Sequence, residues 1–219
     1  MSHAADILRD PQHFTRDISG FQPRESQWVM AESVEKALRN QSDLVVEAET
    51  GTGKTLAYLV PALLDAGPII VSTGTRSLQD QLFFKDLPVV QKALGVQRRV
   101  ALLKGRNNYL CPYRMKLHQE EGRFLTRETA DQLQTVVRWS TRTQTGDLAE
   151  LQELPDDAPV WPWVTSTADN CLGQDCPEYR NCPVMKARQN AQEADLVVVN
   201  HHLFFADAAL KGEGVSELL

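Results

Sequence analysis

The sequence predicts an α/β fold in which a parallel sheet, flanked by helices, is interrupted by a cysteine-bearing insertion. Short β-branched runs alternate with segments of helical periodicity, the pattern of a parallel sheet covered on both faces. A glycine-rich turn follows the first of these runs, and all four cysteines fall between residues 105 and 183. The 219 residues suffice for one large or two small domains with a hydrophobic core.

The first 63 residues predict a helix, a strand, a turn and a second helix. Residues 1–22 show little periodicity, and we expect a loose lead-in there. Apolar residues at helical spacing predict an amphipathic helix over 24–40. Residues 44–46 (LVV) predict a short buried strand, and the glycine-rich turn then leads into a helix that ends near Leu63.

The alternation continues to Lys104 and resumes after the cysteines. We expect strands at 69–71, 100–103 and 196–199, and a helix over 77–94 that is broken near Pro88, because proline lacks an amide donor and crowds the preceding turn. Further helices are expected at 127–142, from Val184 and near Asn200. We therefore divide the chain into residues 1–104 and 184–219, which form the α/β domain, and the insertion 105–183.

Composition narrows the class of protein. The chain is 42% hydrophobic and 24% charged, as in a globular protein, and no apolar run approaches the roughly 18 residues of a membrane helix. The N-terminus has neither the basic stretch nor the apolar core of a secretory signal, so we expect a cytoplasmic protein without membrane partners. A net charge of −6 argues against a basic protein that coats nucleic acid, although residues 92–123 carry a local charge of +6. That run is equally compatible with a solvated face.

The glycine-rich turn has the pattern of a phosphate loop. Its glycines allow backbone amides to face phosphate oxygens, and the helix that follows adds a favourable dipole. A lysine supplies a cation, and the next hydroxyl is placed to bind Mg²⁺. The alternative is that Gly-Lys-Thr occurs in this turn by chance and binds no nucleotide. We expect ATP with Mg²⁺ to bind at Gly51, Thr52, Gly53, Lys54 and Thr55.

Gln27, one helix before this loop, is the candidate reader of adenine. A glutamine amide can bond both the N6 donor and the N7 acceptor of the base, and Phe21 or Arg24 could stack on it. An ordinary helix start explains the same residues about as well.

The four cysteines predict a metal site. They are spaced C-x59-C-x4-C-x5-C, and a cytosolic chain is expected to keep them reduced. The second pair of cysteines typical of zinc knuckles is missing. Three of the four cysteines precede proline, as does the last cysteine of bacterial ferredoxin motifs. Spacing alone favours a [4Fe–4S] cluster and leaves zinc open. The candidate ligands are Cys111, Cys171, Cys176 and Cys182.

Five segments together resemble the DinG/YoaA branch of the XPD-like iron–sulfur helicases of superfamily 2, nearest to its YoaA-type members. These segments are 45–55 (VVEAETGTGKT), 72–82 (STGTRSLQDQL), 103–111 (LKGRNNYLC), 164–171 (VTSTADNC) with the two later cysteines, and 199–203 (VNHHL). The resemblance runs from about Phe21 to the end. It implies a RecA-like first motor domain, a [4Fe–4S] cluster on the four cysteines, and ATP-driven 5′-to-3′ unwinding of DNA in repair or replication.

The resemblance also implies where DNA would be touched. Ser72, Thr73 and Gly74 match the segment that contacts the DNA backbone in the family, although an ordinary strand-to-helix cap would use the same residue types. Lys104 and Arg106 are candidate contacts for a single strand near the cluster. The nearby Tyr109 is more readily explained by core packing.

Two aromatic pairs invite functional interpretations that we set aside. His201 and His202 are adjacent on an expected helix and so do not face one site, which favours a capped helix start over a metal site. Trp161 and Trp163 flank a proline and favour packing over a platform for bases.

Phosphoryl transfer needs more than this sequence contains. The family places an Asp-Glu-Ala-His box after the Asn-His-His segment, and no such box occurs in these 219 residues. We therefore expect an N-terminal fragment that lacks helicase activity by itself. A non-hydrolysing, metal-bearing module that binds nucleic acid or protein is the alternative, and a small-molecule kinase is a distant third.

Overall fold

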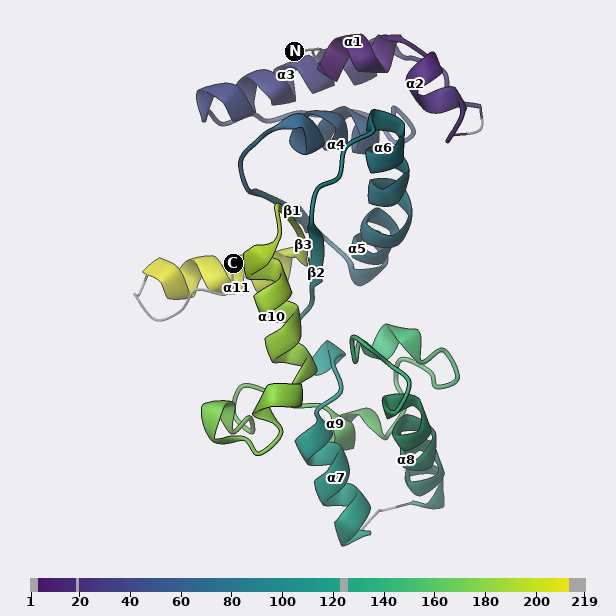
Figure 1. Cartoon of the computed structure of the whole chain (residues 1–219), viewed down its shortest axis with the longest axis vertical. Coiled ribbons are helices and arrows are strands. Elements are labelled where there is room, and N and C mark those ends of the chain that lie inside the picture. Colours follow the sequence, from purple (N-terminus) through teal and green to yellow (C-terminus); the bar gives the residue numbers. More distant parts are fainter. Residues whose placement is uncertain (1–3, 19, 123–125, 213–219) are drawn as a thin grey trace. The chain divides into compact units, whose positions relative to one another are not determined.

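The computed structural model describes residues 4–18, 20–122 and 126–212, with side chains placed through residue 209. By its contacts the chain divides into two compact units (Figure 1). The sheet unit comprises residues 1–102 and 193–201, and the cysteine unit comprises 103–192 and 202–219. Arg123 of the basic run and residues 213–219 lie outside the described residues.

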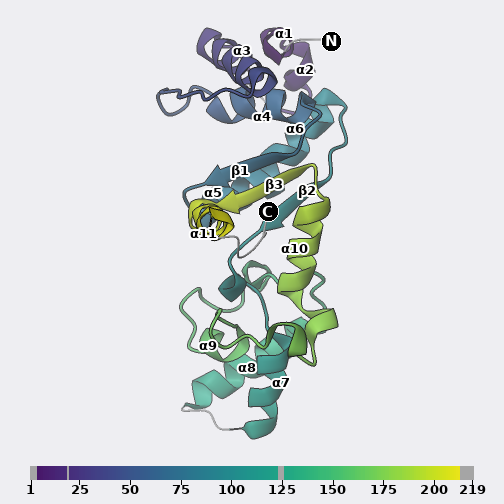
Figure 2. The ribbon, with the colours of Figure 1, turned by 90° about the vertical axis from the view of Figure 1, so that its left-hand side faces the viewer.

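A small sheet organises the sheet unit. Its strands are β1 (Ile69–Thr73), β2 (Val100–Leu103) and β3 (Leu196–Asn200), in the order β1-β3-β2 (Figure 2). β1 and β3 run parallel, with Ile69 opposite Leu196 and Thr73 opposite Asn200. β3 lies in the middle and is buried along its first four residues, as expected of a β-branched run that is covered on both faces. The three strands predicted here are confirmed.

The strand predicted at residues 44–46 is wrong. Within the described part of the chain these residues have no strand partner, and Val45 is 96% exposed. A strand forms only where a neighbour accepts its backbone hydrogen bonds. Three apolar residues in sequence cannot show whether that neighbour exists. Within the described residues, the phosphate loop therefore has no preceding strand to anchor it.

The N-terminal segment is not the loose lead-in that we expected. It forms helices α1 (Ala4–Arg9) and α2 (Gln12–Thr15), which pack against α3 and α6. Leu8 and Phe14 are fully buried in the core of the unit. Six- and four-residue helices are too short to show helical periodicity in sequence, and tertiary packing stabilises them.

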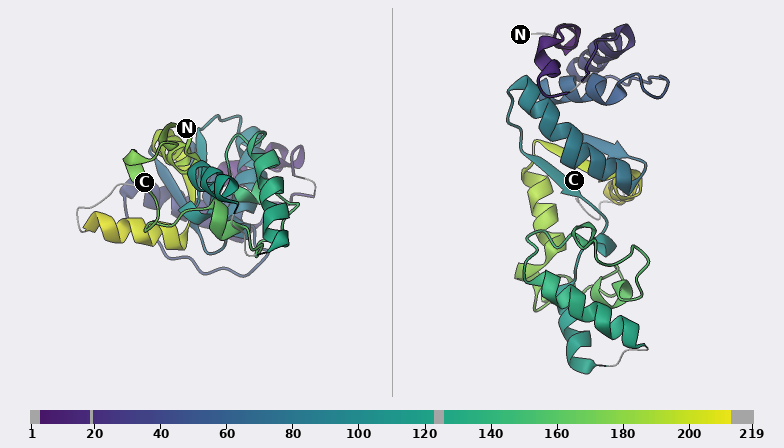
Figure 3. Two further views of the ribbon diagram at one scale, coloured as in Figure 1. Left: turned by 90° about the horizontal axis from the view of Figure 1, so that it is seen from below. Right: turned by 90° about the vertical axis from the view of Figure 1, so that its right-hand side faces the viewer.

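Longer helices complete the sheet unit. α3 (Glu25–Asn40) packs against α4 (Lys54–Leu64), and α5 (Arg76–Gln81) contacts β1 and β3. A π-helical turn, Leu82–Asp86, joins α5 to α6 (Leu87–Leu94), which Figure 3 shows as one long path. The interruption expected near Pro88 is thus a change of helix type, with proline in the first turn of α6, where no amide donor is needed.

The cysteine unit is mainly helical. Its helices are α7 (Pro112–Glu121), α8 (Arg127–Ser140), α9 (Trp161–Val164), α10 (Pro183–Glu193) and α11 (His201–Gly212), although α10 ends and α11 begins in the sheet unit. α8, α10 and α11 were predicted, whereas α7 was missed because its apolar residues do not form one stripe. Leu133, Val136 and Val160 are at the centre of a separate core. No described helix is long and apolar enough to cross a membrane.

A buried ion pair stabilises the beginning of the cysteine unit. Lys104 Nζ lies 2.7 Å from Asp147 Oδ2, and these side chains are 2% and 10% exposed. The Lys104 amide donates to the Tyr109 hydroxyl over 3.1 Å, and Tyr109 and Asp147 form an isolated antiparallel bridge. Two segments about 40 residues apart in sequence are therefore held together by charge and backbone pairing.

Replacing Lys104 with Met should lower the free energy of unfolding by about 3–5 kcal/mol, because a buried carboxylate loses its partner. The double variant Lys104→Met/Asp147→Leu should recover most of this loss. Arg127→Met is the control, since the Arg127–Asp131 pair is almost fully exposed (N–O 4.0 Å) and should contribute at most about 0.5 kcal/mol. Chemical denaturation measures all three changes, and equal effects of Lys104→Met and Arg127→Met would contradict the assignment.

Candidate nucleotide-binding site and cysteine cluster

The phosphate loop connects α3 to α4, and two glycines shape it. Gly51 and Gly53 have φ angles of 83° and 82°, a left-handed conformation that favours glycine. Gly53 is also the N-cap of α4, so Lys54 and Thr55 begin the helix. The sequence thus places a lysine, a hydroxyl and a helix N-terminus at one short turn.

The loop closes around its own lysine. Lys54 Nζ donates to the carbonyls of Ala48 (2.7 Å) and Glu49 (2.6 Å), and the Thr52 hydroxyl donates to the Glu49 carbonyl over 2.9 Å. A phosphate would have to replace these carbonyls at the ammonium group. The Thr55 side chain is hydrogen-bonded to Tyr58, whose pKa is raised mainly by burial and slightly by Asp86.

Gln27 and Arg24 brace the loop from α3 and its N-cap. Gln27 Nε2 donates to the Gly53 carbonyl over 3.1 Å, and an Arg24 guanidinium nitrogen donates to the Gly51 carbonyl. The Gln27 side chain is buried, yet its Oε1 atom has no hydrogen-bond partner in the described residues. Phe21 packs against Phe14, with ring centroids 5.0 Å apart. The structure therefore brings Gln27 to the loop and directs Phe21 into the core.

The segment predicted to touch DNA lies at the carboxyl end of β1. The Ser72 hydroxyl is 2.7 Å from His201 Nδ1, at the start of α11. The Thr73 hydroxyl lies 3.2 Å from the Thr75 carbonyl and 3.5 Å from that of Val199. The Thr75 hydroxyl caps α5 by accepting from Leu78 N. This segment therefore combines strand, cap and exposed backbone, with Gly74 on the surface.

All seven described basic residues of the 92–123 run have partners within the chain. In the sheet unit, Lys92 pairs with Asp17, Arg98 donates to the Gly67 carbonyl (2.6 Å), and Arg99 lies 3.9 Å from Asp195. In the cysteine unit the partners are Asp147 for Lys104, Cys171 for Arg106, the Pro162 carbonyl for Arg114, and Glu178 for Lys116. These basic residues therefore contribute largely to contacts within the protein. Lys104 in particular is buried, so a DNA contact there would require its ion pair to open.

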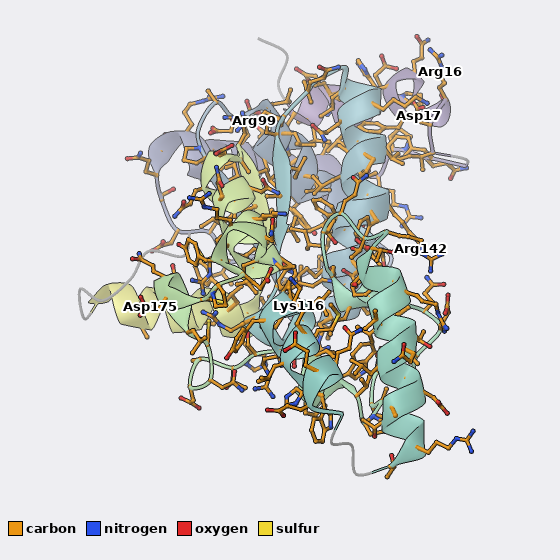
Figure 4. All side chains as sticks on the ribbon, turned by 60° about the horizontal axis from the view of Figure 1, so that its bottom comes forward. Arg16, Asp17, Arg99, Lys116, Arg142 and Asp175 are labelled. Atoms are coloured by element: carbon orange, nitrogen blue, oxygen red, sulfur yellow. The ribbon has the colours of Figure 1, made fainter. Side chains whose placement is uncertain are left out.

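The four cysteines all belong to the cysteine unit, and each is a half-buried free thiol. Two of them directly precede helices, Cys111 before α7 and Cys182 before α10. The Cys111 amide donates to the Val164 carbonyl over 2.7 Å, which joins the first cysteine to the segment that leads to the second. Lys116 on α7, labelled in Figure 4, forms an ion pair with Glu178, which lies between the last two cysteines (Nζ–Oε1 2.6 Å).

Cations and helix ends make the surroundings of these sulfurs suitable for thiolates. Arg106 Nη1 lies 2.8 Å from Cys171 Sγ. Burial and the nearby Arg106 lower the pKa of Arg188. Cys171 and Cys182 lie close enough to this guanidinium to oppose that fall. Burial raises the pKa of the Cys111 thiol, and Cys182 and Cys176 add to the rise. A bound metal would remove that penalty, because a coordinating thiol is deprotonated.

The donor set fits a four-thiolate centre, but the arrangement is not that of metal ligands. Over residues 4–18, 20–122 and 126–212, no three His, Cys, Asp or Glu side chains are placed so that they could hold a metal ion. Four thiols of one unit with two arginines are chemically appropriate for a cluster. That these four thiols bind one cluster together is a proposal.

Known proteins are similar to this chain over nearly its whole length. A family model of DEAD/DEAH box helicases matches residues 29–109, which include the phosphate loop. The ATP-dependent DNA helicases YoaA of Haemophilus influenzae and Escherichia coli are 51% and 50% identical to the chain. Each alignment covers 98% of this chain and 34% of the relative. The chain is a close homologue of the YoaA helicases.

A more distant relative is the 3′-5′ exonuclease DinG of Bacillus subtilis. It is 35% identical over 86% of this chain and 20% of its own length. The chain spans about a third of the length of the two YoaA relatives. The YoaA alignments extend past residue 109, where the helicase family match ends, and so include the region of the cysteines.

Packing accounts for the two tryptophans of this YoaA homologue that were set aside as functional candidates. Trp161 Nε1 donates to the Pro155 carbonyl over 2.8 Å, and Trp163 meets His118 edge-on with centroids 4.8 Å apart. Burial and Arg114 lower the pKa of His118. Tyr109 is buried, as expected. Sequence reasoning missed Arg188 and Asp147, since only the tertiary structure brings them to Cys171 and Lys104.

Gly53→Ala should destabilise the loop of this YoaA homologue more than Gly51→Ala does. Both positions have positive φ, but a Cβ at Gly53 would lie 2.3 Å from Gln27 Nε2, whereas Gly51 faces open space. We expect losses in the free energy of unfolding of about 2–3 kcal/mol and about 1 kcal/mol, respectively. Gln27→Ala should remove most of the additional loss. Equal losses for the two glycines in chemical denaturation would contradict the contact.

Proposed function

We propose that the chain is the ATP-binding part of an iron–sulfur DNA helicase that unwinds DNA with 5′-to-3′ polarity in repair or replication. In this proposal, residues 1–104 and 184–219 belong to a RecA-like motor domain, and residues 105–183 form an inserted iron–sulfur domain. The observation that carries the proposal is the glycine-shaped loop at the start of α4, in a chain homologous to YoaA helicases. Single-stranded or forked DNA would be the macromolecular partner, together with replication or repair proteins.

The loop residues would share the binding of ATP. Backbone amides of Gly51, Thr52 and Gly53 would face the phosphates, Lys54 would exchange its two carbonyl partners for phosphate oxygens, and Thr55 would bind Mg²⁺. Gln27 would accept a hydrogen bond from the adenine amino group, and its unpartnered Oε1 atom supports that role. Hydrolysis would need an acidic metal-binding box that these 219 residues lack.

Two further sites complete the proposal. Ser72, Thr73 and Gly74 would hold the DNA backbone, and Arg106 with Lys104 would lie near a single strand at the cysteine unit. Cys111, Cys171, Cys176 and Cys182 would bind a [4Fe–4S] cluster. Such a cluster supplies a four-thiolate crosslink and a redox-active centre.

Two observations favour a second candidate, a non-hydrolysing, metal-bearing module that binds nucleic acid or protein. The loop is closed on its own lysine, and residues 44–46 have no strand partner in the described chain. The two candidate functions can be distinguished in a protein that contains this chain together with the additional sequence found in its relatives. Lys54→Ala should abolish unwinding there if the chain is part of a motor, and should change nothing if the loop is vestigial.

The 219-residue chain should bind nucleotide weakly and hydrolyse it negligibly. Weak binding is expected because Lys54 must first give up two carbonyl partners. Titration of a fluorescent ATP analogue measures binding, which Lys54→Ala should abolish and Lys36→Ala, an exposed lysine on α3, should leave unchanged. DNA-stimulated ATP turnover at rates of about 1 s⁻¹ or more would refute the prediction.

The chain purified without oxygen should be brown and contain about four irons. Iron analysis and the visible spectrum measure this directly. Cys111→Ser should lose most of the iron, whereas Gln119→Ala, an exposed change on α7, should retain it. Stoichiometric zinc without iron in fresh protein would overturn the cluster assignment.

A further inference from the structure

Two segments far apart in the sequence meet at the carboxyl ends of β1 and β3. The parallel register places Ser72 opposite Val199 and Thr73 opposite Asn200, so the next residue, His201, lies beside the end of β1. His201 Nδ1 is 2.7 Å from the Ser72 hydroxyl. Both residues belong to the sheet unit.

The Ser72 hydroxyl differs from its neighbours in the kind of partner it has. Thr73 donates its single hydroxyl hydrogen to a backbone carbonyl, and the Thr75 hydroxyl is engaged in capping α5. A ring nitrogen can either accept or donate, depending on the tautomer of the histidine. If Nδ1 accepts, the Ser72 hydrogen is used within the protein. If Nδ1 carries a hydrogen and donates, the Ser72 hydrogen is available to an outside acceptor.

We propose that His201 is a positioning residue for DNA, which orients the Ser72 hydroxyl so that it donates to a backbone phosphate. Phosphate oxygens only accept hydrogen bonds, so a bound phosphate would select the arrangement in which His201 donates to Ser72. Gly74 lies next to the His201 ring, since a Cβ at this position would be 3.8 Å from His201 Cδ2 and 3.9 Å from Nε2. The inference rests on the proposed contact of Ser72, Thr73 and Gly74 with DNA.

The test measures how the 219-residue chain binds a fluorescent oligothymidine, by anisotropy. His201→Ala should weaken binding roughly fivefold to tenfold, the cost of one hydrogen bond of ordinary strength. His201→Asn places an amide nitrogen near the position of Nδ1 and should restore most of the affinity. His202→Ala, an exposed change at the adjacent residue, is the matched control and should have no effect.

A double-mutant cycle tests whether His201 acts through Ser72. The variant Ser72→Ala/His201→Ala should bind no more weakly than Ser72→Ala, because without the Ser72 hydroxyl His201 has no group left to orient toward DNA. Additive losses would overturn the proposal in favour of a direct contact between His201 and DNA. A His201→Ala variant with a lower melting temperature and unchanged DNA affinity would show a purely structural contact and would also overturn it.

The outcomes also separate this inference from the proposed function. If the wild-type chain does not bind the oligonucleotide, the proposed DNA contact of Ser72, Thr73 and Gly74 fails, and the role of His201 fails with it. If the wild-type chain binds and Ser72→Ala weakens binding but His201→Ala has no effect, only the present inference is overturned.

Discussion

The parallel pairing of β1 with β3 is the constraint on which the rest of the structure depends. More than 120 residues separate the paired positions Ile69 and Leu196, and residues 103–192 of the cysteine unit lie within that interval. Closing so long a loop costs conformational entropy, which the pairing must offset. The insertion lowers this cost because it folds around its own core of Leu133, Val136 and neighbouring residues. The sheet can therefore close although its central strand comes last in sequence.

This pairing also explains why candidate functional residues gather at one edge of the sheet. Parallel strands present their carboxyl ends on the same side, where loops are free to bind ligands. Ser72 and His201 meet there through a hydrogen bond that neither segment could form alone. The phosphate loop has a different anchor, since Gln27 and Arg24 hold its backbone and Lys54 fills its centre.

The basic residues show how a charge pattern can mislead. A local excess of positive charge suggests a surface for nucleic acid, yet each described member of the 92–123 run has a partner within the chain. The Arg99–Asp195 pair is exposed and therefore weak, so Arg99 could exchange its partner at little cost. Lys104 could not, because its pair with Asp147 is buried.

The local features of this protein were determined by its sequence. The glycines at positive φ, the lysine at the start of α4, the three strands and the long helices α3 and α8 follow from residues within a few positions of each other. The homology to YoaA helicases agrees with the motifs that were recognised first.

Features that depend on distant partners were decided by the tertiary structure. Residues 44–46 lack a strand because no neighbour in the described chain accepts their hydrogen bonds, and helices α1 and α2 exist because Leu8 and Phe14 find a core. Lys104, a proposed DNA contact, forms a buried ion pair because Asp147 lies beside it. In each case the deciding energy is a contact between residues far apart in sequence, which local pattern cannot show.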